Sequence, residues 1–267
     1  MRVFDSHAHY DDEKFEMDRD NIIQEIHRSG VEKIISAGYS LEASKKAIEL
    51  AKKYDFLYAT CGISPNDIEG IKIEDLEQIR TLAKENKNFV GAFTTRPIVV
   101  AIGEIGLDYY WNKENKEEQK SFFIKQIEIA NELDLPIVIH TREAIMDTID
   151  ILKNKITCNR KGVFHCCPLN IELVKEALKL GFYISMAGPI TFKNSKNADE
   201  IIKYVPLDKI LIETDSPYLA PEPVRGTRNN SSNLKYIVQK IANAKSTTEN
   251  EIETATYNNA CRLFGIN

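Results

Sequence analysis

The sequence has little that would mark a secreted or membrane-bound protein. Its five cysteines form no C-x-x-C pair, so neither a disulfide framework nor a zinc site of that type is indicated, and idle thiols in a reducing compartment are expected. The chain opens without the apolar region of a secretory signal, and no apolar run approaches the roughly 18 residues of a membrane-spanning helix. These absences predict a cytoplasmic protein with no membrane segment.

The chain also has no excess of positive charge. The chain has 35 Lys and Arg against 40 Asp and Glu, a formal net charge of -5. Proteins that coat long stretches of nucleic acid need a basic surface, so that class is disfavoured. An enzyme that binds a few phosphates is compatible with this net charge, because bound metal ions can supply local positive charge. The sequence has no G-x-S-x-G, Walker loop or H-E-x-x-H motif, which disfavours the hydrolase classes that depend on them.

Short β-rich runs alternate with amphipathic helical patterns along the whole chain. Most of these runs are almost continuously apolar, which is typical of parallel strands covered on both faces. About eight strand–helix units in 267 residues predict an α/β fold, a (β/α)8 TIM-like barrel forming a single domain over residues 1–267. A doubly wound open sheet is the alternative, but the Gly-rich phosphate fingerprint is missing. The predicted strands are 3–7, 33–38, 57–63, 99–106, 136–141, 162–166, 182–188 and 209–215.

Four of the five histidines stand at ends of predicted strands, where such barrels carry their chemistry. His7 and His9 form an H-x-H pair, whose imidazoles point to one face of an extended segment. His27 lies in a helical pattern and is interpreted as a surface residue. Imidazoles together with strand-end carboxylates predict a metal site. The predicted ligands are His7, His9, Glu104, His140, His165 and Asp215.

This number of ligands suggests two divalent ions, with Glu104 bridging them. Two ions roughly 3.5–4 Å apart can clamp the attacking and leaving oxygens of a phosphoryl displacement and generate hydroxide between them. Mg²⁺ is expected to support activity, with Mn²⁺ or Zn²⁺ as alternatives, since imidazoles tolerate all three and carboxylates favour the harder ions.

The chain resembles the TatD family of metal-dependent deoxyribonucleases of the amidohydrolase superfamily over essentially its whole length. The resemblance implies a TIM-like barrel, the same six metal ligands, and magnesium-supported hydrolysis of DNA, commonly from the 3′ end of single strands, with links to DNA repair. It also implies that Asp215 takes the proton from the attacking water, so Asp215 and Glu104 are the expected catalytic residues. The motifs that carry it are DSHAH (5–9), GEIGLDYYW (103–111), HTREA (140–144), HC (165–166), GPITFKNS (188–195), ETDSPYLAP (213–221) and RGTRN (225–229).

The substrate side of the site departs from the family pattern. Members often carry G-[IV]-H-P-H after the third strand, where this chain has Ser64 and Asn66. Both can donate hydrogen bonds to a phosphate, but neither can become cationic near neutral pH. Substrate binding is expected of Ser64 and Asn66, of Arg142 through its guanidinium fork, and of Arg228 and Asn229 in the loop after the eighth strand.

Several alternatives remain open. Tyr109, Tyr110 and Trp111 can stack an unpaired base or pack the barrel rim, and packing is expected for at least two of them. Glu213 is expected to support a ligand rather than bind metal. The acidic charge favours an exonuclease over an endonuclease, with single-stranded DNA or 3′ ends as the substrate. A monomer without an obligate protein partner is expected. An ester hydrolase such as a D-aminoacyl-tRNA deacylase on the same barrel is the rival function, and a non-catalytic metal-binding or nucleic-acid-binding module is a second.

Overall fold

The computed structural model describes residues 2–90 and 95–266. Tertiary contacts divide the chain into two compact units. The terminal unit comprises residues 2–36 and 165–262, and the central unit comprises residues 37–164 and 263–266. Each unit has its own set of parallel strands, and both supply predicted site residues.

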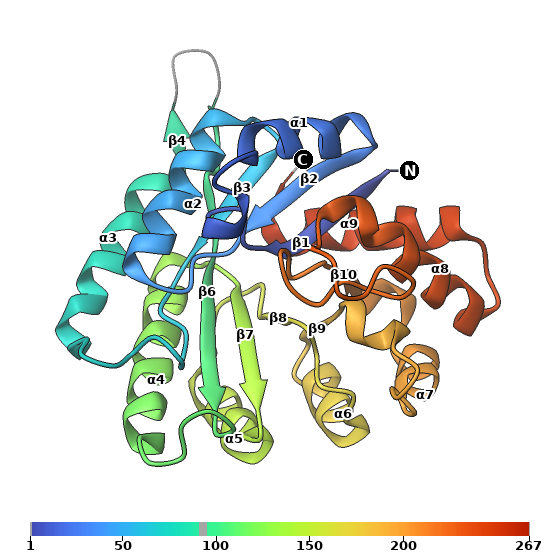
Figure 1. Ribbon diagram of the computed structural model, residues 1–267. Helices are drawn as coiled ribbons and strands as arrows, with labels where there is room; N and C mark the ends of the chain where they lie inside the picture. Colours follow the sequence, from blue (N-terminus) through green and yellow to red (C-terminus); the bar gives the residue numbers. More distant parts are fainter. Residues whose placement is uncertain (1, 91–94, 267) are drawn as a thin grey trace. The chain divides into compact units, whose positions relative to one another are not determined.

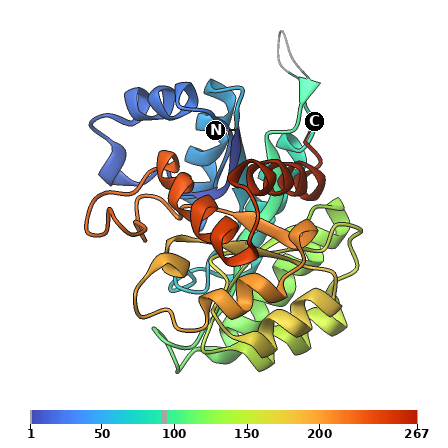
Figure 2. The same ribbon diagram turned by 90° about the vertical axis from the view of Figure 1, so that its right-hand side faces the viewer.

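The terminal unit pairs strands from both ends of the chain (Figure 1). Strand β1 (Val3–Ala8) pairs in parallel with β2 (Val31–Ser36), and β9 (Tyr183–Met186) pairs in parallel with β10 (Ile210–Ile212). β1 also contacts β10. Helices α1 (Arg19–Arg28), α6 (Ile171–Lys179), α7 (Ala198–Tyr204), α8 (Leu234–Lys245) and α9 (Glu249–Phe264) complete this part of the chain. Helix α6 packs on β9, and α7 packs on α8 (Figure 2).

The central unit has strands β3 (Leu57–Cys61), β6 (Val99–Asp108), β7 (Ile137–Arg142) and β8 (Gly162–Phe164) side by side in chain order. Helices α2 (Leu41–Lys53), α3 (Leu76–Asn86) and α4 (Lys116–Leu133) lie next to one another and cover β3 and β6, and α5 (Ile145–Lys155) packs on β7 (Figure 1). A short antiparallel ribbon, β4 (Phe89–Val90) with β5 (Thr95–Arg96), precedes β6.

The strands are buried because their sequences are apolar on both faces. Every residue of β1, β3 and β6 is buried, as expected for parallel strands covered by helices. All eight predicted strands are present with ends shifted by a few residues, and β6 runs on to Asp108. The fold is the predicted α/β class, a (β/α)8 TIM-like barrel.

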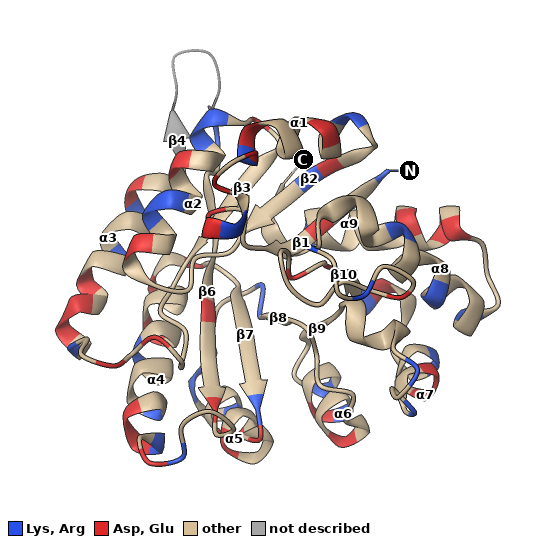
Figure 3. Ribbon diagram, in the orientation of Figure 1, with Lys and Arg blue, Asp and Glu red and all other residues tan. Residues whose placement is uncertain are grey.

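The surface helices carry charges of both signs. Acidic and basic side chains are interspersed along α3 and α4 (Figure 3), where pairs such as Lys120–Glu117 and Lys125–Glu128 lie one helical turn apart. Among the described residues, no helix is long and apolar enough to span a membrane.

Candidate metal centre

His7 and His9 project from the carboxyl end of β1 to the same side, as the strand periodicity predicts. Their Nε2 atoms are 3.2 Å apart. Asp215 Oδ1 lies 3.3 Å from His9 Nε2 and 3.6 Å from His7 Nε2. Both histidines are buried, so three donor atoms converge in a place with little access to bulk water. This is an arrangement that suits a divalent cation.

The backbone fixes Asp215 beside β1. Asp215 follows β10 and adopts a left-handed conformation with φ of 56°. Its N–H donates to His7 O at 3.0 Å, and His9 N–H donates to Ser216 O at 2.6 Å. Burial disfavours the carboxylate, but the hydrogen bond from His9 and the nearby imidazoles outweigh burial and hold the pKa of Asp215 below its usual range. The side chain is therefore an anion at neutral pH.

His165 adds a further donor from the segment after β8. Its ring stacks on that of His7, with centroids 4.1 Å apart and planes at 20°. His165 Nδ1 lies 3.3 Å from Glu213 Oε1, which also accepts a 2.6 Å hydrogen bond from Cys166 N–H. Glu213 therefore lies where it can support His165, as the sequence suggested. His7, His165 and Asp215 each place one donor atom within 4.8 Å of the others.

The central unit holds a second cluster, formed by neighbouring strands β6 and β7. Glu104 Oε1 lies 3.1 Å from His140 Nδ1. His140 pairs in register with Gly106, two residues along β6 from Glu104, so both side chains lie on the same face of the sheet. Glu104 is buried and His140 is partly exposed.

Asp108 lies in the candidate site although it was not among the residues predicted for it. Its Oδ2 lies 2.8 Å from His140 Nε2, so a fully buried carboxylate orients the imidazole. Burial raises the pKa of Asp108, but the hydrogen bond with His140 and those from the N–H groups of Tyr110 and Trp111 hold the pKa below its usual range. A signal was present, because Asp108 is four residues from Glu104 and so on the same strand face.

Three predicted substrate-binding residues lie in the central unit. Ser64 is buried and its Oγ accepts a hydrogen bond from Asn66 N–H at 3.2 Å. Asn66 is exposed and its Nδ2 donates to Asp108 Oδ2 at 3.3 Å, which connects it to the His140 cluster. Arg142 is exposed at the end of β7. Their contact with substrate stays a prediction.

Arg228 and Asn229 already have partners within the terminal unit. Arg228 makes two hydrogen bonds with the Asp18 carboxylate, at 2.8 and 2.6 Å, and donates to Lys14 O. Asn229 is fully buried and donates to Thr214 O and Tyr218 O. Both side chains hold the loop after β10 in place, and their contact with substrate also stays a prediction.

The expectation that at least two of the three consecutive aromatic residues pack is wrong. Tyr109 is buried and donates to Asp147 Oδ2 at 2.7 Å. Tyr110 and Trp111 are 44% and 68% exposed. The reason is local: Asp108 turns the chain by accepting hydrogen bonds from the backbone N–H groups of both residues, which leaves their rings outside the core.

The donors suit a divalent metal in both clusters. Each cluster combines imidazole nitrogens with carboxylate oxygens, the ligand types that Zn²⁺ and Mn²⁺ accept. Each also has a buried carboxylate on one imidazole, Glu213 on His165 and Asp108 on His140, as is common for histidines that bind metal.

Comparisons with known proteins agree with this chemistry. The family model described as TatD related DNase matches residues 4–265. The metal-dependent hydrolase YabD of Bacillus subtilis (strain 168) is 41% identical over 265 residues, covering 99% of this chain and 100% of that protein. The metal-dependent hydrolase YcfH of Escherichia coli (strain K12) is 36% identical over 270 residues, covering 100% and 97%.

Solved structures extend the likeness to three dimensions. The crystal structure of YjjV, a TatD homolog from Escherichia coli K12, matches with a TM-score of 0.90 and 28% identity, covering 100% of this chain and 99% of that one.

Proposed function

Because the chain belongs to the TatD family of metal-dependent hydrolases, we propose that it hydrolyses phosphodiester bonds in DNA as a 3′-to-5′ exonuclease on single strands. The observation that carries this proposal is the convergence of buried His7 and His9 with the partly exposed carboxylate of Asp215 within 3.6 Å. The family name supports DNA as the substrate. A link to DNA repair belongs to the same proposal.

We also propose that the two clusters act as one ligand set for two divalent ions, in a single hydrolase barrel spanning residues 1–267. Glu104, on the strand beside the one that carries His140, is the proposed shared ligand of the two ions. Mg²⁺ is the proposed physiological metal, with Mn²⁺ or Zn²⁺ as alternatives. The proposed ligands are His7, His9, Glu104, His140, His165 and Asp215.

The proposed reaction divides the work between the metal and the chain's own residues. When bound, the ions would supply positive charge at the phosphate and lower the pKa of water. Asp215, ionised at neutral pH, accepts the proton of the attacking water at a carboxylate oxygen. Asp108 and Glu213 keep the imidazoles of His140 and His165 in one orientation. Arg142 offers a charged guanidinium to a phosphate oxygen.

Two predicted substrate-binding residues, Ser64 and Asn66, have neutral side chains. Ser64 and Asn66 can bind a phosphate only through hydrogen bonds, since neither has a proton to exchange near pH 7. We propose that they position the strand, together with Arg228 and Asn229, and take no part in proton transfer. A monomeric protein in the cytoplasm, with DNA as its partner, fits the free cysteines and the proposed substrate.

Digestion of a 5′-labelled single-stranded oligodeoxynucleotide tests this function. In metal-stripped buffer with added Mg²⁺, the wild type should give a ladder that shortens from the 3′ end, and Glu104→Ala should give none. The matched control is His27→Ala, which removes an exposed imidazole on α1 and should cleave like the wild type. Internal cuts by the wild type would exclude the exonuclease.

The choice of substrate distinguishes the proposed nuclease from the rival ester hydrolase. If a folded, metal-loaded wild type leaves DNA intact, the proposal fails, and hydrolysis of a D-aminoacyl-tRNA ester becomes the function to test. Ser64 and Asn66 would then account for the change of substrate. Turnover of neither substrate would indicate a binding module.

A further inference from the structure

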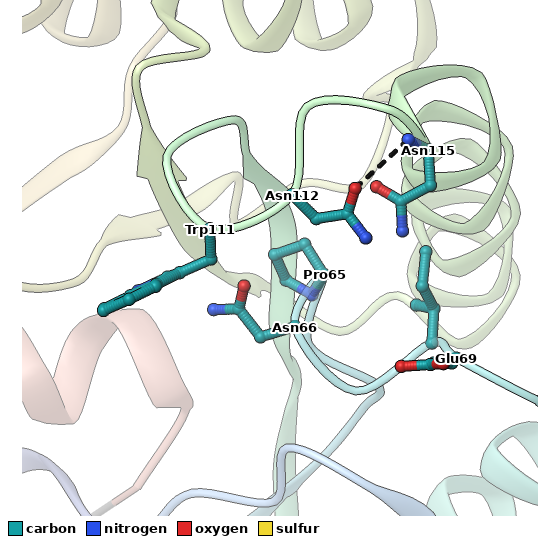
Figure 4. Close-up of a pocket in the computed structure, with 7 residues that line it drawn as sticks. Pro65, Asn66, Glu69, Trp111, Asn112 and Asn115 are labelled. Atoms are coloured by element: carbon teal, nitrogen blue, oxygen red, sulfur yellow. Dashed lines mark hydrogen bonds between the residues drawn. The ribbon is translucent and has the colours of Figure 1, made fainter.

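The central unit contains a polar cavity in which the proposed function uses only Asn66. The cavity has a volume of about 400 Å³ and lies beside the chain that follows β6. Asn66 and Trp111 are at one end and Glu69 is at the other, with Asn112 and Asn115 along the side (Figure 4). We call it the Trp111 pocket. Pro65 and Ile68 complete its lining with apolar surface.

The charge of the lining excludes phosphate as the occupant. Among the described residues that line the pocket there is no Lys or Arg. Glu69 is the only charged residue of this lining. A phosphate group would meet the negative charge of Glu69 with no cation in the lining to offset it. The pocket therefore suits a neutral, polar group.

The amide groups of the pocket are set by its own loop. Asn112 Oδ1 accepts hydrogen bonds from the N–H groups of Glu114 and Asn115, at 3.1 and 3.3 Å. Asn115 Oδ1 accepts a bond from Gln119 Nε2 at 2.8 Å. Because both oxygens are used, each side chain presents its NH₂ group as a donor toward the cavity (Figure 4).

An exposed aromatic surface adjoins these donors. Trp111 is 68% exposed and Tyr110 is 44% exposed, and their rings meet edge to face with centroids 4.8 Å apart. The Arg142 guanidinium lies over the Tyr110 ring at 3.7 Å and 5.4 Å from the centre of the Trp111 ring. Flat rings with a planar cation are the surface on which unpaired bases stack.

Asp108 joins the pocket to the predicted metal ligands. One oxygen accepts the backbone N–H groups of Tyr110 and Trp111, and the other bonds to Asn66 Nδ2 and lies 2.8 Å from His140 Nε2. The same buried carboxylate thus fixes the aromatic pair, a pocket wall and a ligand imidazole. A group held in the pocket would have a defined place relative to the ligand His140.

We propose that the Trp111 pocket binds a nucleobase of the DNA strand. The inference rests on the proposed function and adds to it a binding site for the base. The base stacks on Trp111 while Asn112 and Asn115 donate hydrogen bonds to its ring nitrogen or carbonyl acceptors. Glu69 accepts a hydrogen bond from an exocyclic amino group, which adenine, cytosine and guanine have and thymine lacks.

The single tryptophan makes this binding measurable without catalysis. Trp111 is the only tryptophan of the chain, so tryptophan fluorescence reports on this one side chain of the pocket. In metal-stripped buffer with chelator, dAMP and dCMP should quench the fluorescence saturably, and dTMP should require at least a tenfold higher concentration. 2-Deoxyribose 5-phosphate, which has no base, should not quench. Free N-acetyltryptophanamide corrects for absorption by the nucleotide.

Two variants locate the binding while keeping the reporter. Asn112→Ala should weaken quenching by dAMP about tenfold, and Glu69→Gln should reduce the difference between dCMP and dTMP. Equal quenching by all nucleotides in wild type and Asn112→Ala would show collisions with an exposed ring and would overturn the proposal. Quenching by the sugar phosphate alone would do the same.

Oligonucleotide kinetics separate this inference from the proposed function. If DNA is cleaved, Trp111→Ala should raise KM about tenfold, the fold-change equal to about 1.4 kcal/mol, with a smaller effect on kcat. Tyr204→Ala, which removes an exposed aromatic ring from α7, should leave both constants unchanged. Unchanged KM in Trp111→Ala with intact cleavage would overturn the pocket and leave the nuclease. Saturable quenching by nucleotides without any cleavage of DNA would support the pocket and overturn the proposed nuclease.

Discussion

At the scale of single residues, Asp108 offers a test of the candidate centre that leaves every predicted ligand in place. Asp108→Asn keeps an oxygen for the backbone N–H groups but turns an NH₂ group toward His140 Nε2, where a donor has no acceptor. Loss of such a supporting carboxylate typically weakens metal affinity 10–100-fold. We expect a fall in that range, measured by calorimetric titration of the metal-stripped protein with Mn²⁺.

Asp147→Asn is the matched control for this change. Asp147 is also an aspartate of the central unit, but it bonds to Tyr109 Oη and Lys120 Nζ rather than to a histidine. Its substitution should leave Mn²⁺ affinity unchanged. Equal affinities in both variants would mean that Asp108 does not position a ligand.

The positions of the proposed ligands were predictable from the sequence, but the residues that support them were predictable only in part. His7, His140 and His165 stand at strand ends, and strand ends can be located from apolar runs alone. Glu213, two residues before Asp215, was expected to support a ligand rather than bind metal, and it lies beside His165. The contact between Asp108 and His140 depends on the register between β6 and β7, which a single sequence does not reveal.

At the scale of secondary-structure elements, Gly106 sets how closely β6 and β7 approach. It has φ of +145°, and a Cβ atom at this position would lie 1.9 Å from His140 O. Gly106→Ala must therefore separate the strands at the point where Glu104 and His140 meet. We expect a loss of more than about 3 kcal/mol in the free energy of unfolding, measured by urea denaturation.

The control for Gly106 is a glycine with similar backbone demands and open surroundings. Gly70 has φ of +75°, and a Cβ there would meet nothing within 4 Å. Gly70→Ala should lose only the backbone strain of a left-handed residue, about 1–2 kcal/mol. If the two substitutions cost the same, the close approach of the strands does not require glycine.

A charged pair links the segment before α1 to the loop after β10. The hydrogen bonds from Arg228 hold the pKa of Asp18 below its usual range. A lowered carboxylate pKa contributes stability above the ordinary pKa of about 3.9 and loses it as the pH falls through the lower value. Because both side chains are about a third or more exposed, the contribution at pH 7 should be below about 1 kcal/mol.

Urea unfolding of Asp18→Asn measures this contribution. The variant should be less stable than the wild type by up to about 1 kcal/mol at pH 5, and the difference should shrink by pH 3 as Asp18 becomes protonated. A difference that stays constant between the two pH values would assign the effect to lost packing rather than to the ion pair.

The elements themselves were largely predictable. All eight strands follow from runs of apolar residues, because parallel strands buried on both faces have no polar alternation to obscure them. The exposure of Tyr110 and Trp111 was not predictable, since it depends on how Asp108 turns the chain after β6. Aromatic rings are usually expected to be buried, but here the hydrogen bonds to Asp108 fix a turn that leaves both rings exposed.

At the scale of the whole molecule, the donor set is divided between the two contact units. The terminal unit supplies His7, His9, His165 and Asp215, and the central unit supplies Glu104 and His140. A ligand that binds only the folded state stabilises it by about 2.7 kcal/mol at 100 times its Kd. If one centre uses all six residues, metal binding must depend on both units at once.

Thermal unfolding with and without Mn²⁺ tests that dependence. At saturating metal the melting temperature of the wild type should rise by roughly 5–10 °C. His7→Ala and His140→Ala, one substitution in each unit, should each lose most of this rise, whereas His27→Ala should keep it. If His140→Ala kept the full rise, the metal would be bound by the terminal unit alone, where His7, His165 and Asp215 already place donor atoms within 4.8 Å of one another. The proposed bridging role of Glu104 would then be wrong, because no second ion would remain for it to share.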